Sequence, residues 1–215
     1  MPLVVDYRSK TTSLKRARHP LFRSTPSPLF VIPVTWPAGT GQDRIVLLHH
    51  SNRCLPAILI QRPRTEVGFS IKADLQANRI EEGAKALLTD EHGFITEGTG
   101  NNFFIARDGE IFTPKPHNIL RGVSRQACME LSAKEGIPVH QVDIEPYDVR
   151  MADEAWWTAT TICMIPITRF DFQSVGDGKP GPIYHSLLNA WSTEVGVDIS
   201  AQAERYAELG RTWVP

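Results

Sequence analysis

The sequence has few of the features that mark specialised classes of protein. Its three cysteines, Cys54, Cys128 and Cys163, show neither metal-ligand spacing nor even pairing, which predicts reduced thiols. No apolar run approaches the roughly 18 residues that a membrane-spanning helix requires, and no hydrophobic signal-peptide core follows the start. We therefore expect a soluble protein in the cytoplasm. A transit-like interpretation of the basic, Ser/Thr-containing start is a weaker alternative.

A complete dinucleotide-binding fingerprint is also missing. That loop needs three glycines opening a helix after a parallel strand. In FITEGTGNNFFI, residues 94–105, Gly98 and Gly100 lead straight into another apolar strand. The pattern argues against phosphate binding by this loop and leaves a question about Glu97, because a glutamate at a strand end is ordinarily a solvated edge residue.

The chain has an ordinary composition but an uneven distribution of charge. Its 215 residues are 41% hydrophobic and 22% charged, enough to bury a core. Residues 1–72 carry 11 Lys/Arg against 3 Asp/Glu, or +8, and residues 73–215 carry 12 against 21, or −9. Half of the 16 prolines also lie in the first part. These shifts predict an atypical or truncated N-terminal segment over 1–72 and a domain over 73–215.

The second part shows alternating strand and turn signals. Residues 84–90 and 94–98 form one expected hairpin, and residues 101–107 and 110–114 form another around Asp108-Gly109. Further strands are expected from GIPVHQVDI and DEAWWTATTICMIPITRFD. Hairpins covered by a few helices predict an α+β domain rather than a parallel nucleotide-binding sheet.

Two helices are expected to cover these strands. The first runs from about Ser124, a good N-cap residue, to Gly136, with a buried stripe of Ala127, Cys128 and Leu131. The second has Pro182 in its first turn, and its apolar face is formed by Ile183, Leu187, Ala190 and Trp191.

Three features suit a ligand with an anionic group at one end and a basic ring nitrogen at the other. Glu97 supplies a carboxylate, and the start of the first helix offers free backbone N–H groups beside Gly122. The TATT cluster, residues 158–161, supplies hydroxyls.

Four blocks in sequence order carry a family resemblance: LLTDEHGFITEGTGNNFFI, ILRGVSRQACMELSAKEGIPV, ADEAWWTATTICMIPITRFD and GDGKPGPIYHSLLNAW. Over residues 73–200 the chain resembles the class IV aminotransferases, the fold-type IV pyridoxal-phosphate enzymes. These include branched-chain and D-amino-acid aminotransferases and aminodeoxychorismate lyase. The resemblance implies transfer of an amino group between an amino acid, branched-chain or similar, and a 2-oxo acid, in a homodimer.

The resemblance also implies roles for particular residues. Glu97 stands where the family glutamate bonds the pyridine nitrogen of pyridoxal 5′-phosphate. The backbone N–H groups of Val123 and Ser124 would hold the phosphate, together with the hydroxyl of Thr160. Thr161 would border cofactor and substrate. Cys163 is expected to be a core thiol, and the pair Asp153-Glu154 to be structural.

The family's Schiff-base lysine has no counterpart at its expected place. Counting back from Glu97 leads to Pro63, Arg64 and Thr65, none of which can form an imine. The nearest upstream lysine, Lys72, falls inside the expected helix, half a turn from the required face. It would serve as the catalytic lysine only if a shortened connection moved it.

Several alternatives therefore stay open. The chain is either a diverged homologue with a reduced first domain or the product of a shifted reading frame before residue 73. Its function is a transaminase, a lyase of the aminodeoxychorismate type, or a non-catalytic structural remnant. The scattered charges of residues 1–72 do not favour nucleic-acid binding.

Overall fold

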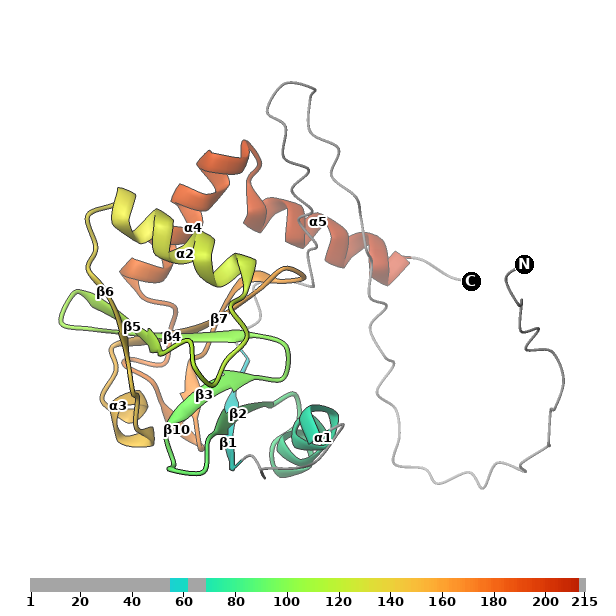
Figure 1. Cartoon of the computed structure of the whole chain (residues 1–215). Coiled ribbons are helices and arrows are strands. Elements are labelled where there is room, and N and C mark those ends of the chain that lie inside the picture. The colour runs from blue at the N-terminus through green and yellow to red at the C-terminus, as the bar shows by residue number, and fades with distance from the viewer. Residues whose placement is uncertain (1–54, 62–68, 213–215) are drawn as a thin grey trace, which may run out of the picture.

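The computed structural model describes residues 55–61 and 69–212 (Figure 1). The strands are β1 (Ala57–Gln61), β2 (Lys85–Thr89), β3 (Ile95–Gly98), β4 (Asn102–Arg107), β5 (Glu110–Pro114), β6 (Val139–Val142), β7 (Glu154–Ala159), β8 (Cys163–Pro166), β9 (Arg169–Phe170) and β10 (Gln173–Ser174). The helices are α1 (Phe69–Ile80), α2 (Val123–Lys134), α3 (Pro146–Arg150), α4 (Pro182–Val195) and α5 (Ile199–Thr212).

The strands form two five-stranded mixed sheets. The first has the order β10-β9-β1-β2-β3 and the second the order β6-β5-β4-β7-β8. The expected hairpins are confirmed, because β2 pairs antiparallel with β3 and β4 pairs antiparallel with β5. At the second turn, Asp108 and Gly109 both have positive φ, 54° and 82°, as a tight hairpin requires.

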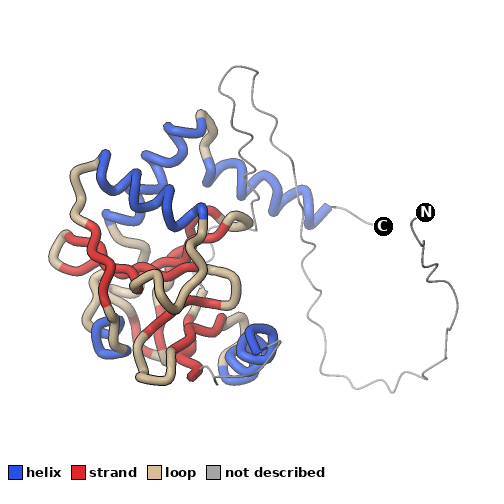
Figure 2. Tube along the Cα trace, viewed as in Figure 1, coloured by secondary structure: helices blue, strands red, loops and turns tan. Residues whose placement is uncertain are grey.

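The two sheets and the helices pack in layers. Helices α2 and α4 cover one face of the second sheet, and α1 lies against β1 and β2 of the first (Figures 1 and 2). One hydrophobic cluster lies between α2, α4 and the second sheet, a second joins the two sheets, and a third lies under α1. The described part of the chain is thus an α+β fold with both sheets sandwiched.

Strand β4 shows how the sequence produces this layering. Phe104 packs into the cluster under α2 and α4, whereas Phe103 packs into the cluster between the sheets. Their partners on β7 follow the same two-residue period, with Trp156 stacked on Phe104 and Trp157 tilted against Phe103. Because both faces are covered, β7 is almost entirely buried and lacks the alternation of a half-exposed strand.

The structure adds parallel pairing that the hairpin pattern did not predict. β1 runs parallel to β2 and is connected to it through α1, and β6 runs parallel to β5. β1, with the sequence AILIQ, was missed because a five-residue apolar run lacks a distinctive period. The description of the domain as antiparallel hairpins is therefore incomplete.

The two expected covering helices are present, with one correction. α4 begins with Pro182 in its first turn, and Leu187 and Trp191 are buried while Ile183 and Ala190 pack beside them. α2 begins at Val123, and its N-cap is Gly122, so the assignment of Ser124 as N-cap was wrong. In the predicted stripe of α2, Cys128 and Leu131 are buried and Ala127 is partly so.

Several predictions lie outside the described residues. They include Cys54 and the lysine position at residues 63–65. The assignment of residues 1–72 as an atypical segment stays a prediction. In the described ranges, no helix combines the length and apolar character needed to cross a membrane.

Candidate active site

The chain crosses from the first sheet to the second directly after Glu97. This glutamate is half-buried on β3, and its Oε2 accepts hydrogen bonds from the backbone N–H of Leu120 at 2.9 Å and from Nδ2 of Asn102 at 3.3 Å. Two donors on other elements therefore fix the carboxylate. Glu97 is not a solvated edge residue.

The glycines after Glu97 serve the crossing between sheets. A Cβ at Gly98 would lie 2.9 Å from Cζ3 of Trp157, so only glycine packs here without displacing the indole. Gly100 has a φ of +104°, a region that side chains other than glycine rarely adopt. The N–H of Gly98 donates to the carbonyl of Asn101 at 2.8 Å, closing a tight turn. The loop is a strand-to-strand connection, as the sequence predicted.

The N-terminus of α2 faces the same region. Gly122 is extended, with φ −66° and ψ 143°, and within residues 55–61 and 69–212 no side chain caps the helix. The first-turn N–H groups have no acceptor within the helix, and they form the positive end of its dipole. Val123 is 80% exposed there, and Ser124 is buried. This terminus can receive an anion.

Hydroxyl groups come from the end of β7. Thr158 is 0% exposed, and its Oγ1 has no hydrogen-bond partner in the described part of the chain. A buried hydroxyl without a partner costs about 1–3 kcal/mol. Thr160 is exposed in the turn directly after β7, and it also lines the site.

These groups line one small, open hollow. The described residues lining it are Glu97, Gly100, Asn101, Asn102, Leu120, Gly122, Val123, Ser124, Thr158, Ala159 and Thr160. Four predicted site residues, Glu97, Val123, Ser124 and Thr160, therefore lie together. Neither Thr161 nor Lys72 is among the described residues that line the hollow.

Lys72 lies in α1, as expected, and is exposed. Helix α1 follows β1 after residues 62–68. The strand-to-helix connection in which the family lysine was sought is therefore present between described elements. Its residues 63–65 lie outside the described ranges.

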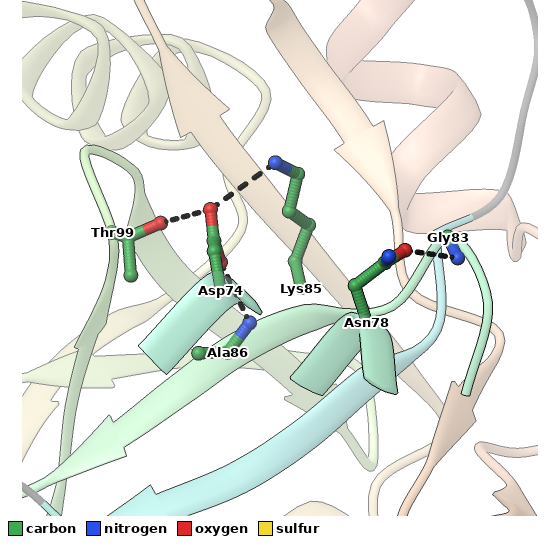
Figure 3. A network of polar contacts seen from close by, with 6 residues as sticks. All are labelled: Asp74, Asn78, Gly83, Lys85, Ala86 and Thr99. Atoms are coloured by element: carbon green, nitrogen blue, oxygen red, sulfur yellow. Dashed lines mark hydrogen bonds and ion pairs between the residues drawn. The ribbon is translucent and has the colours of Figure 1, made fainter. Parts of the chain in front are cut away.

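A polar network ties α1 to the loop after Glu97 (Figure 3). One carboxylate oxygen of Asp74 accepts from Oγ1 of Thr99 at 2.5 Å and pairs with Nζ of Lys85 at 3.1 Å. Its other oxygen accepts from the backbone N–H of Ala86 on β2 at 3.0 Å. Asp74 thus joins the helix, the first sheet and the crossing loop.

The remaining candidates have structural positions. Cys163 is buried, and burial together with nearby Cys128 raises the pKa of its thiol, consistent with a core thiol. Glu154 is also buried, and its two oxygens accept from the N–H groups of Ile183 and Tyr184 at 2.9 and 2.8 Å. It caps α4 from β7. Asp153 accepts from the N–H of Asp108 at 2.9 Å.

No pattern in the sequence indicated an individual site role for Asn102, Leu120 or Thr158. Asn102 stood in the quoted stretch, but a strand-initial asparagine carries no signal of a carboxylate contact. Thr158 belongs to the TATT cluster. Because β7 is almost entirely buried, its sequence lacks the alternation of apolar and polar residues from which the direction of the Thr158 side chain could have been predicted. Across the described ranges, no cluster of side chains suited to a metal ion is present.

The fold and site define a known family. The family model described as amino-transferase class IV matches residues 8–170, and the chain belongs to this family. The match begins upstream of the four blocks recognised in the sequence, so it includes most of the basic segment. The family binds pyridoxal phosphate.

Individual relatives include two curated enzymes. A branched-chain-amino-acid aminotransferase of Pseudomonas aeruginosa is 34% identical over 120 residues, which is 56% of this chain and 39% of that protein. A D-alanine aminotransferase of Listeria innocua is 40% identical over 102 residues, which is 47% of this chain and 35% of that protein. The chain thus matches well under two thirds of the length of each.

Solved structures share the fold. The crystal structure of the Escherichia coli branched-chain amino acid aminotransferase is 26% identical and has a TM-score of 0.62. The match covers 66% of this chain and 51% of that one. The fold of the described residues is therefore that of the class IV aminotransferases over about two thirds of the chain.

Proposed function

We propose that the hollow binds pyridoxal 5′-phosphate and that the chain is a class IV transaminase. The reaction would move an amino group between an amino acid, branched-chain or similar, and a 2-oxo acid. One observation carries the proposal. An anchored carboxylate, a helix N-terminus that no described side chain caps and a buried hydroxyl without a partner among the described residues meet in a single hollow.

These groups fit the cofactor. A phosphate group suits the N–H groups of Val123 and Ser124, where the helix dipole and unsatisfied donors favour an anion, with the Thr160 hydroxyl beside them. The Glu97 carboxylate suits a protonated pyridine nitrogen. The Thr158 hydroxyl gives the hollow a further polar group that a ligand or water would satisfy.

Each residue then has a defined task. When bound, pyridoxal phosphate supplies an electron sink for the charge left as the substrate loses its Cα proton. Glu97 holds the proton on the ring nitrogen, and its bonds from Leu120 and Asn102 keep its carboxylate in place. The α2 N-terminus would anchor the phosphate end. The role of Thr161 beside cofactor and substrate rests on the family resemblance alone, because Thr161 is not among the described residues that line the hollow.

The lysine is the open part of this proposal. A transaminase needs an amine that attaches to the cofactor and moves the proton. Lys72 is the candidate, although it lies in α1 and does not line the described hollow. With no lysine at 63–65, a chain that binds the cofactor without turnover is the main alternative, acting as a structural or interaction domain.

An absorbance titration with pyridoxal phosphate, followed by borohydride reduction and peptide mapping, separates these outcomes. A reduced adduct on Lys72, abolished in Lys72→Arg and retained in Lys134→Arg, supports a working transaminase. Reversible binding without any adduct supports the non-catalytic alternative. Absence of binding by the folded protein contradicts the cofactor proposal itself.

A second enzymatic function uses the same cofactor site. An aminodeoxychorismate lyase-like enzyme eliminates pyruvate, so pyruvate release without an amino acceptor would distinguish it from transamination. A homodimer and a cytoplasmic location also stay predictions that follow from the family. Analytical ultracentrifugation of the full chain tests the dimer.

A further inference from the structure

Asn102 is one of the residues that line the hollow. It is the first residue of β4 and is buried. Its Nδ2 donates to Oε2 of Glu97 at 3.3 Å and to the backbone carbonyl of Leu120 at 2.8 Å. Both neighbours are acceptors, which fixes the orientation of the amide with nitrogen toward them.

The contacts form a closed loop of three groups. Leu120 donates its N–H to the Glu97 oxygen that Asn102 also contacts, and it accepts from Asn102 through its carbonyl. One buried amide therefore bridges the carboxylate on β3 and the turn that leads into α2.

Gly122, the N-cap of α2, lies directly against this amide. A Cβ at Gly122 would lie 2.1 Å from Oδ1 of Asn102, closer than real contacts allow. Gly122 is extended rather than left-handed, with φ −66°, so backbone conformation does not require glycine here. The close approach of Asn102 does.

We infer that Asn102 is a positioning residue that sets the Glu97 carboxylate relative to the N-terminal turn of α2, so that a ring nitrogen and an anionic group can be bound together. The inference rests on the proposed function. Asn102 acts on the ring nitrogen only through Glu97. Its loss should therefore weaken ligands that carry a ring nitrogen more than ligands that do not.

Two probes test this on the full chain. One is pyridoxal 5′-phosphate, and the other is its 1-deaza analogue, in which a C–H group replaces the ring nitrogen and the phosphate is unchanged. Dissociation constants are measured by tryptophan fluorescence for the wild type, Asn102→Ala and Asn102→Leu. Asn189→Ala, an exposed change on α4, is the matched control. Melting curves establish that each variant is folded.

Asn102→Ala is expected to weaken pyridoxal phosphate by about tenfold or more, the usual effect of losing a hydrogen bond to a charged group. The 1-deaza analogue should lose several-fold less, and Asn189→Ala should change neither constant. Asn102→Leu keeps the branched shape of the side chain but has no donor and no charge, so it should show the same selective loss. It carries the test if Asn102→Ala does not fold.

Equal losses for both probes, or none, would overturn this inference while leaving the proposed function intact. A wild type that binds neither probe would overturn the proposed function and the inference with it.

Discussion

Replacing Glu154 by glutamine should destabilise the protein measurably, even though the residue lies outside the hollow. The side chain is only 5% exposed, and each carboxylate oxygen accepts one backbone N–H from the first turn of α4, at 2.9 and 2.8 Å. A Cβ at Gly181 would lie 2.1 Å from Cδ of Glu154. Glycine therefore allows the carboxylate to reach the helix.

In Glu154→Gln, one acceptor becomes an NH₂ group that faces an N–H donor. One charge-assisted bond is lost, and the buried donor at Ile183 or Tyr184 is left without an acceptor. Such a loss costs about 1.5–3 kcal/mol. For a chain of this length each kcal/mol lowers the melting temperature by roughly 2–4 °C, so we expect a decrease of about 3–12 °C.

The assay is thermal denaturation followed by circular dichroism at neutral pH. Glu82→Gln, a change at an exposed position after α1, is the matched control and should melt like the wild type. Glu154→Ala should melt lower than Glu154→Gln, because both N–H groups then lack an acceptor. If Glu154→Gln melted with the control, the carboxylate would not be what stabilises α4.

Three further predictions concern other parts of the fold. Gly122→Ala should lower the melting temperature because the new Cβ collides with Asn102, and adding Asn102→Ala should recover part of that loss; strictly additive effects would show that the two residues do not compete for space. Asp74→Asn should speed amide hydrogen exchange at residues 99–101, because it weakens the hydrogen bond from Thr99. The melting temperature should stay nearly unchanged, since the Asp74–Lys85 pair is partly exposed. Unaltered exchange at residues 99–101 would contradict a link between Asp74 and this loop. Burial raises the pKa of the Cys128 thiol to about 12 from its usual 9.0. The contribution of the protonated thiol to the free energy of unfolding is therefore fully present below pH 9 and is lost as the pH rises toward 12. Alkylation of Cys128 in the native protein at pH 9–10 would refute this burial.

The sequence predicted those parts of the fold that depend on local signals. The Asp108-Gly109 turn, Pro182 at the start of α4 and Gly136 after α2 each require a particular backbone conformation, which short stretches of sequence reveal. Gly136 adopts the positive φ of +72° that ends a helix. By contrast, β1 pairs with strands distant in sequence, and no local pattern specifies such partners.

The sequence predicted four residues of the candidate site but not the hydrogen bonds that connect the site. Glu97, Val123, Ser124 and Thr160 were found through the family resemblance, and the hollow brings them together. Asn102 was missed because its role depends on the Leu120 carbonyl, 18 residues away. Gly122 was expected to admit an anion, whereas the structure shows a side-chain amide against it.

The chain spans roughly half the length of related solved structures. The positions of the described groups predict how the ligand is oriented in the hollow. This prediction can be tested without measuring turnover.

The most direct test is a crystal structure of the full chain with pyridoxal phosphate. The account predicts the phosphate at the N–H groups of Val123 and Ser124, with the ring nitrogen within hydrogen-bond distance of the Glu97 carboxylate. Cofactor bound elsewhere, or bound in this hollow with its ring nitrogen turned away from Glu97, would contradict the central claim.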